Sequence, residues 1–328
     1  MKDMMPNFNL VQPADLASAI STLANAGENG WAMAGGQDSL DWFKDRVKRP
    51  TTVVDLSGID GLTGVTETAD GGVEIGAMTT LTDVENNPII KEKFGVLTMA
   101  AGRVASPQIR NKGTLGGNIS QDARCWYYRS GLDCYRAGGN TCYADTPEGM
   151  NREHCLFGAS RCVAVTPSDT AVAVTTLEAE MVIAGPGGER VVPASEFFIG
   201  PAIDITRMTV LEPGDVLTKI RIPGKWAGAQ FSFEKVADRN TWDFALVNMA
   251  CAMKISGGVI EDISLTCGAV ECVPKRLTVV EDIVRGSAPD EETANLGAGA
   301  ASRGASPLNY NHFKIPLMEN LVKKAIRG

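Results

Sequence analysis

The sequence concentrates cysteine in one short stretch. Of the 8 cysteines in the chain of 328 residues, five fall there: Cys125, Cys134, Cys142, Cys155 and Cys162. The N-terminal segment Met1–Leu10 lacks the apolar core of a secretory signal, so clustered thiols indicate metal binding or redox chemistry rather than disulfides. No Cys-x-x-Cys pair, the usual mark of a structural zinc site, occurs among them. The spacing therefore favours an iron–sulfur cluster bound by four thiolates on a wrapping loop.

The cysteine stretch leaves some alternatives open. Four thiolates suffice for a 4Fe-4S cluster, so one cysteine is left over, and spacing does not decide whether Cys155 or Cys162 is the fourth ligand. A loop held by disulfides or zinc would also use these residues. His154 is either an unusual ligand or, as we expect, a surface histidine. Cys251, Cys267 and Cys272 show no sign of being ligands, and the first two, in strand-like apolar runs, are expected to be small buried residues.

Two turns containing glycine offer a second kind of chemistry. The first, Ala34–Ser39, follows an apolar run, and successive backbone N–H groups at such a turn can bind a pyrophosphate. The second, Thr114–Asp122, is expected to add backbone donors and side chains able to bond a ribose, ribityl or flavin atom. Each turn alone would fit a plain tight turn. Neither matches the Gly-x-Gly-x-x-Gly of a Rossmann nicotinamide site.

Alternating helices and strands must position these groups. Helical spacing predicts a helix opened by Pro13, and Ser106-Pro107 is predicted to end the helical segment Ile90–Val104, which makes Gln108–Asp122 a loop. Gly257-Gly258 is predicted to be a hairpin turn. Strands and helices are also predicted at Thr52–Leu56, Val73–Ala77, Leu81–Asn86, Thr170–Leu177, Phe231–Val236, Ala245–Ile255, Val259–Val270, Glu291–Arg303 and Pro316–Arg327.

Composition excludes several classes of function. Apolar residues make up 44% and charged residues 21% of the chain, which predicts a protein folded almost throughout. The formal net charge of -8 comes with no dense cluster of Lys and Arg, so nucleic acid is not an expected partner. No run approaches the about 18 apolar residues of a membrane span, and a cytoplasmic protein is expected.

The two turns together resemble the FAD-binding subunit of the xanthine dehydrogenase and carbon monoxide dehydrogenase family. The resemblance rests on Ala34-Gly35-Gly36-Gln37-Asp38-Ser39-Leu40 and Thr114-Leu115-Gly116-Gly117-Asn118 and extends over nearly the whole chain. It implies an α+β fold: a two-part FAD-binding domain of the molybdopterin-dehydrogenase flavoprotein type, followed by a smaller C-terminal α+β domain. The expected parts are residues 1–60, residues 61–225 with a cysteine-rich insertion at 123–164, and residues 226–328.

The resemblance also implies the residues that bind FAD. The pyrophosphate and ribose are expected on the first turn: Met33, Ala34, Gly35, Gly36, Gln37, Asp38 and Ser39. The flavin side is expected on the second: Thr114, Gly116, Gly117, Asn118, Gln121 and Asp122. Because a carboxylate near phosphates would be repelled, Asp38 is expected to bond a hydroxyl or a loop N–H. The stretches Phe233–Arg239 and Asp243–Ala245 resemble the start of the domain that closes over the flavin ring.

The insertion resembles the one in the flavin subunit of 4-hydroxybenzoyl-CoA reductase, where four cysteines bind an extra 4Fe-4S cluster. The local match is Cys134–Cys142, with a lead-in at Gln121–Cys125 and an exit at Arg161-Cys162. This resemblance implies the ligands Cys125, Cys134, Cys142 and Cys162. The longer interval before Cys162 departs from the pattern and keeps Cys155 as an alternative.

The implied function is electron transfer within a molybdenum-dependent oxidoreductase. The resemblance implies a large molybdenum-cofactor subunit and a small 2Fe-2S subunit as partners, in a dimer of heterotrimers, with a ferredoxin-like external carrier if electrons enter at the 4Fe-4S cluster. The direction of flow stays open. A self-contained FAD-dependent oxidase with a structural metal is the alternative, although the only two histidines, His154 and His312, lie near neither turn. A zinc-bearing scaffold would leave both turns unexplained.

Overall fold

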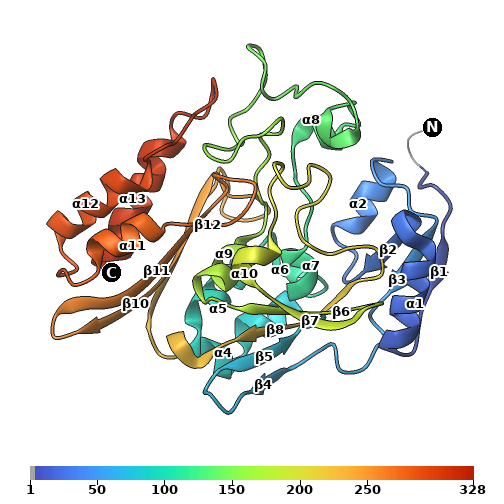
Figure 1. Ribbon diagram of the computed structural model, residues 1–328, viewed down its shortest axis with the longest axis horizontal. Helices are drawn as coiled ribbons and strands as arrows, with labels where there is room; N and C mark the ends of the chain where they lie inside the picture. The colour runs from blue at the N-terminus through green and yellow to red at the C-terminus, as the bar shows by residue number, and fades with distance from the viewer. Residues whose placement is uncertain (1–3) are drawn as a thin grey trace.

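The computed structural model describes residues 4–328, so the first three residues of the Met1–Leu10 segment lie outside the described residues. The chain begins with a parallel sheet of order β1-β3-β2 and two helices (Figure 1). Their bounds are β1 (Asn9–Val11), α1 (Leu16–Ala26), β2 (Gly30–Met33), α2 (Ser39–Lys44) and β3 (Thr52–Asp55). The predicted start of α1 at Pro13 is wrong, because the Asp15 side chain caps the helix by accepting from the Ser18 N–H at 2.8 Å.

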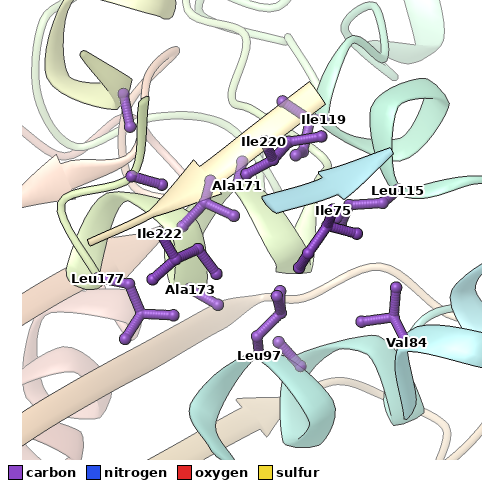
Figure 2. Packing of buried hydrophobic residues seen from close by; sticks show 14 of the residues in the cluster. Ile75, Val84, Leu97, Leu115, Ile119, Ala171, Ala173, Leu177, Ile220 and Ile222 are labelled. Carbon is purple, nitrogen blue, oxygen red and sulfur yellow. The ribbon is translucent and has the colours of Figure 1, made fainter. Parts of the chain in front are cut away.

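A five-stranded antiparallel sheet of order β4-β5-β8-β6-β7 forms the centre. Its strands are β4 (Val65–Glu67), β5 (Val73–Gly76), β6 (Glu180–Gly185), β7 (Gly188–Pro193) and β8 (Val216–Ile222). The neighbouring helices are α3 (Leu81–Asn86), α4 (Pro88–Lys93), α5 (Gly95–Gly102), α6 (Pro107–Arg110), α7 (Leu115–Ile119), α9 (Asp169–Thr176) and α10 (Ala194–Phe197). Ile75 and Ile220 of the sheet pack in one core with Leu97 of α5 and Ala173 of α9 (Figure 2). This core fixes α7 and α9, which border the site described below.

The predicted loop Gln108–Asp122 is wrong, because α6 and α7 occupy most of it. Ser106 caps α6, and Pro107 takes its first position, where a missing N–H costs nothing. The Thr114 hydroxyl caps α7 by accepting from the Gly117 N–H at 3.1 Å. The helical segment Ile90–Val104 is likewise two helices, α4 and α5, which meet at Phe94. In residues 106–119, the hydrogen bonds of the capping side chains therefore outweigh the tendency of Pro and Gly to prevent a helix.

The C-terminal part is an antiparallel sheet of order β12-β11-β10-β9 covered by three helices (Figure 1). These elements are β9 (Gln230–Val236), β10 (Val247–Ser256), β11 (Val259–Gly268), β12 (Lys275–Arg276), α11 (Thr278–Val284), α12 (Glu291–Ala301) and α13 (Lys314–Arg327). The Gly257-Gly258 hairpin is confirmed, with φ of 58° and 82°. Alternate residues of β10 serve two cores: Ala250 belongs to the central core, whereas Cys251 packs with the covering helices.

The insertion at residues 123–164 lies between α7 and α9 and carries a short helix, α8 (Trp126–Arg129), drawn in green at the top of Figure 1. One side contacts the N-terminal part, where the rings of Tyr128 and Trp42 lie 5.5 Å apart. The other side contacts the C-terminal part, where the Leu156 N–H donates to the Val270 carbonyl at 2.7 Å. Neighbouring cores on both sides thus support a segment with little regular structure. None of the helices described within residues 4–328 has the length and apolar character of a membrane span.

Candidate cofactor site and cysteine cavity

The two glycine turns touch each other. A Cβ at Gly35 would lie 1.9 Å from the carbonyl oxygen of Lys112, so only glycine permits this approach between the backbones. A Cβ at Gly117 would lie 3.4 Å from the Cβ of Ala34. The turn after β2 and the start of α7 therefore form one continuous wall, although they are far apart in the sequence.

This wall borders a cavity with an empty volume of about 1250 Å³ that is open to solvent. Most of the residues expected to bind FAD line it: Ala34, Gly35, Gly36, Gln37, Asp38, Ser39, Thr114, Gly117, Asn118, Gln121 and Asp122. Met33 and Gly116 do not. Met33 ends β2, where its carbonyl accepts from the Leu56 N–H at 3.0 Å, and a Cβ at Gly116 would lie 2.7 Å from that of Ala77. We call this space the flavin cavity.

The first turn has free backbone donors. Within residues 4–328, no protein group accepts a hydrogen bond from the N–H of Gly35, Gly36, Gln37 or Asp38. Gly36 has φ of 73°, a left-handed conformation that glycine adopts without strain. A run of unused N–H groups at a turn is the arrangement that binds phosphate oxygens. The first turn therefore fits a pyrophosphate.

The second turn differs from the sequence-based expectation. Its N–H groups are already used, since Gly116 donates to the Ala77 carbonyl at 2.8 Å and Asn118 to the Thr114 carbonyl at 2.9 Å. The Asn118 side-chain oxygen accepts from the hydroxyls of Ser168 and Thr170 on the α9 side. The expectation of further free backbone donors is therefore wrong for these residues. They shape the cavity wall and hold it against α9.

Asp38 has partners other than those expected. Its Oδ1 forms an ion pair with Arg124 of the insertion, and its Oδ2 accepts from the indole N–H of Trp42 at 3.0 Å. Burial raises the pKa of Asp38, and the positive charge of Arg124 acts against that rise. Within residues 4–328, no loop N–H donates to Asp38, so that part of the expectation is wrong, whereas a bond to a hydroxyl of the nucleotide stays a prediction. The guanidinium of Arg124 also stacks on Phe244, 4.7 Å from its ring centroid, and so joins the first turn to the C-terminal part.

Asp122 links the flavin cavity to the insertion in a second place. Its carboxylate pairs with Arg136 and lies 3.2 Å from the Lys48 ammonium. Burial would raise the pKa of Asp122, but Arg136 and Lys48 outweigh burial and hold that pKa below its ordinary value. Arg136 in turn donates to the Ile205 carbonyl at 2.7 Å. A charged carboxylate is thus retained at the cavity edge by residues from three parts of the chain.

The opposite side of the flavin cavity comes from α9 and the C-terminal part. Lys235 of β9 lies 2.6 Å from Asp169 of α9, and both side chains are almost fully buried. Asn248 of β10 donates to the other Asp169 oxygen at 2.6 Å. Trp242 and Phe244 also line the cavity. The resemblance of the stretches Phe233–Arg239 and Asp243–Ala245 predicted that the C-terminal part closes over the site. It could not show that Lys235 pairs with a residue of α9.

Four cysteines of the insertion surround one small cavity. Cys125, Cys134, Cys142 and Cys162 line this space of about 20 Å³, together with Arg136 and several tyrosines. Cys155 does not line it and belongs instead to a small buried cluster with Ala144 and Val163. All eight cysteines are free thiols, and burial raises the pKa of Cys125 to about 11. Within residues 4–328, no three His, Cys, Asp or Glu side chains are arranged as a site for a single metal ion.

His154 is not the surface residue that the sequence predicted. It is 3% exposed, and its Nε2 lies 3.2 Å from the Sγ of Cys125. The Lys314 ammonium of α13 donates to the His154 carbonyl at 2.9 Å. This burial could not be predicted from local spacing, because Lys314 lies far away in the chain. The downstream cysteines Cys251 and Cys267 are buried, as predicted, and Cys272 is buried as well.

The flavin cavity and the cysteine cavity are adjacent. Arg124 lines the first and the next residue, Cys125, lines the second. Arg136 lines the cysteine cavity while it pairs with Asp122 of the flavin cavity. A third space of about 1480 Å³ opens between the insertion and the C-terminal part, and both Cys125 and His154 lie on its wall. The arrangement brings the wall formed by the two turns within one peptide bond of a thiol-lined space.

Comparison with known proteins identifies the fold. Residues 6–225 match the FAD binding domain in molybdopterin dehydrogenase, and residues 232–328 match the CO dehydrogenase flavoprotein C-terminal domain. The chain is 28% identical over 327 residues to the carbon monoxide dehydrogenase medium chain of Hydrogenophaga pseudoflava, with 98% of this chain and 97% of that one covered. It is 34% identical over 229 residues to the aldehyde oxidoreductase FAD-binding subunit of Escherichia coli (strain K12), covering 69% of this chain and 71% of that one.

Solved structures agree with the sequence matches. A chain of the carbon monoxide dehydrogenase from Hydrogenophaga pseudoflava superposes with a TM-score of 0.79 at 28% identity, covering 98% of this chain and 97% of that one. A chain of quinoline 2-oxidoreductase from Pseudomonas putida 86 gives a TM-score of 0.77 at 26% identity, covering 98% and 96%. These matches confirm the predicted flavoprotein fold with its C-terminal domain. The chain therefore belongs to the FAD-binding medium subunits of the carbon monoxide dehydrogenase and xanthine dehydrogenase family, the flavin subunits of molybdenum hydroxylase-type oxidoreductases.

Proposed function

We propose that this chain relays electrons between FAD in the flavin cavity and a 4Fe-4S cluster in the cysteine cavity. One observation carries the proposal: the cysteines Cys125, Cys134, Cys142 and Cys162 all line one space, whereas Cys155 does not. Cubane clusters take one thiolate for each of four irons, which this donor set provides. The structure thus supports Cys162 over Cys155 as the fourth ligand.

The surroundings of the cysteine cavity suit a negatively charged cluster. A cluster held by four thiolates carries excess negative charge, and the buried guanidinium of Arg136 lies on the cavity wall. Iron would take the place of the thiol protons, which burial otherwise retains, as the raised pKa of Cys125 shows. Arg136 stays charged at this depth because it pairs with Asp122. Arg136 is therefore placed to offset cluster charge while it holds the edge of the flavin cavity.

We assign the pyrophosphate of FAD to the first turn, where the N–H groups of Gly35–Asp38 have no acceptor among the described residues 4–328. The second turn and Asp122 border the flavin portion, and Trp242 and Phe244 close the cavity from the C-terminal part. When bound, FAD exchanges electrons in pairs or singly and an iron–sulfur cluster exchanges them singly, so the two together couple the two kinds of transfer. The Arg124-Cys125 peptide joins the two cavities directly.

The proposed partners follow from the family. The matched relatives are named as a medium chain and as an FAD-binding subunit, so we propose a large molybdenum-cofactor subunit and a small 2Fe-2S subunit here, in a dimer of heterotrimers. The 4Fe-4S cluster would give a ferredoxin-like carrier a one-electron entry point. Such entry would suit a reductase like 4-hydroxybenzoyl-CoA reductase, in which electrons run toward molybdenum.

Metal and flavin analysis of single-cysteine variants tests this proposal. Protein purified without oxygen should contain about four irons and four sulfides per chain, as this cluster type requires. Replacing Cys125, Cys134, Cys142 or Cys162 by serine should remove iron and leave FAD largely bound, because the flavin cavity is a separate space. The matched control is Cys155→Ser, which should keep both cofactors.

Two outcomes would change the proposal. Stoichiometric zinc without sulfide in the anaerobic protein would contradict the relay. Loss of iron in Cys155→Ser but not in Cys162→Ser would exchange the fourth ligand and leave the relay standing.

A further inference from the structure

We propose that His154 donates a hydrogen bond from Nε2 to the Cys125 sulfur and thereby raises the reduction potential of the cluster. The inference rests on the proposed function, since Cys125 is one of the proposed cluster ligands. His154 would not bind iron itself. It would act through Cys125 as a positioning residue that sets how readily the cluster accepts an electron.

The contact between the two side chains is short and buried. The Nε2 of His154 lies 3.2 Å from the Sγ of Cys125, and His154 is 3% exposed. At this depth water competes little for the imidazole, so an unused N–H would carry a desolvation cost. Within residues 4–328, the other ring nitrogen, Nδ1, has no hydrogen-bond partner. The Cys125 sulfur is thus the one protein group offered to this ring.

The chemistry of a ligating thiolate fixes the direction of the bond. A cysteine bound to iron has lost its proton, so its sulfur can only accept. A neutral imidazole has one N–H and one bare nitrogen. If the proton is on Nε2, that N–H donates to the thiolate. The nitrogen without a proton is then Nδ1, for which residues 4–328 provide no acceptor. The opposite tautomer would bury an unpartnered N–H at Nδ1 and set a lone pair against the sulfur.

The backbone holds His154 in place without help from its ring. Its N–H donates to the Asn151 carbonyl at 3.0 Å. Its carbonyl accepts from Lys314 Nζ at 2.9 Å and from Asn311 Nδ2 at 3.1 Å. These bonds do not involve the imidazole, so a change of side chain leaves them available. The donor is therefore fixed by the C-terminal part, while its acceptor belongs to the insertion.

Hydrogen bonds to cluster sulfurs are one of the means by which proteins adjust the potential. An N–H donor stabilises the more negative, reduced cluster more than the oxidised one, and so raises the potential. Removing the donor should shift the ratio of oxidised to reduced cluster at a fixed potential by about tenfold, which is about 59 mV for a one-electron step. The shift should be toward more negative potential.

The test compares cluster potentials in the full chain with both cofactors bound, by redox titration followed with electron paramagnetic resonance. His154→Phe keeps a ring of similar size without a donor and should show the negative shift. His154→Gln keeps an N–H donor and should lie closer to the wild type. The matched control is His312→Phe, which changes the only other histidine, an exposed one, and should leave the potential unchanged.

Iron and sulfide assays on the wild type separate this inference from the proposed function. Absence of a cluster there would overturn the relay itself. A cluster whose potential is the same in the wild type and in His154→Phe would overturn only the role of His154. An equal shift in His312→Phe would do the same, because it would show that the effect is not local.

If the His154→Phe variant fails to keep its cluster, a measurement on the wild type still tests the hydrogen bond. In protein labelled with ¹⁵N-histidine, the reduced cluster should show a weak nitrogen coupling, and this coupling should vanish in His154→Gln. A strong coupling would show that His154 binds iron directly. That result, or no coupling at all, would contradict the hydrogen bond.

Discussion

The buried pair of Lys235 and Asp169 shows how much a single charge can matter beside the flavin cavity. Replacing Lys235 by Met leaves the Asp169 carboxylate buried without its cation, although Asn248 still donates to it. Breaking such a pair typically costs about 3–5 kcal/mol, because a charge remains in a site that water does not reach. We expect Lys235→Met to lower the free energy of unfolding by that order, measured by denaturant titration.

A second substitution serves as the control for this pair. Lys235→Met combined with Asp169→Asn removes both charges, so most of the lost stability should return. A Lys235→Met variant that unfolds at the same denaturant concentration as the wild type would show that the pair does not stabilise the fold.

The sequence singled out four cysteines that the structure places around one cavity, but not the residues that surround them. Cys125, Cys134, Cys142 and Cys162 could be singled out because their type, clustering and resemblance agree, and the structure gathers them around one cavity. Arg124 and His154 could not, because each acts through a partner that folding brings from elsewhere: Asp38 for the arginine and Lys314 for the histidine backbone. Pairing across the chain is invisible to local spacing.

Contact between the two turns makes Gly35 more sensitive than a turn glycine usually is. A Cβ at Gly35 would meet the Lys112 carbonyl at 1.9 Å, so Gly35→Ala must push the start of α7 away from the turn after β2. Forcing extra atoms into packed backbone costs about 1–3 kcal/mol. We expect Gly35→Ala to lose most of its FAD, measured as flavin per chain after gel filtration.

Gly200→Ala is the matched control for Gly35→Ala. A Cβ at Gly200 would have no neighbour within 4 Å, and this glycine is not in the left-handed region. The control should therefore retain the flavin content of the wild type. Full flavin content in Gly35→Ala would show that the wall tolerates separation of the turns.

Helix α3 could be predicted from the sequence, whereas helix α7 could not. Helix α3 has the predicted bounds, Leu81–Asn86, since apolar spacing and packing agree there. Helix α7 was missed because Gly116-Gly117 reads as a loop, and glycine disfavours helix. The Thr114 cap and the core position of Leu115 outweigh that preference. Tertiary packing thus decided the element that carries the second turn.

Across the whole molecule, the two halves of the insertion should respond differently to loss of iron. The part containing Cys125, Cys134 and Cys142 has little regular structure, and we expect metal ligation to supply part of its order. Residues 154–157 are held instead by Val270 and by residues before and in α13. We expect limited trypsin treatment of iron-free protein to cut after Arg129 and Arg136 first, as mass spectrometry would show.

The control is the Cys134→Ser variant, which should lack iron without treatment by a chelator. It should give the same tryptic fragments as the iron-free wild type. Equal cleavage in the loaded and iron-free proteins would contradict a role for ligation in ordering this half. First cuts within residues 154–157 would show that the contacts with the C-terminal part do not hold that segment.

The hydrogen bonds that hold residues 154–157 can form only late in the synthesis of the chain. Their hydrogen-bond partners, from Val270 to Lys314, leave the ribosome more than a hundred residues later than the insertion itself. Cys155 packs with Ala144 and Val163, which line the thiol-lined space, so a segment next to that space stays without its partners until translation is nearly complete. If the cysteine cavity holds the proposed cluster, a chain truncated before α13 would have to bind it without the contacts that Lys314 provides.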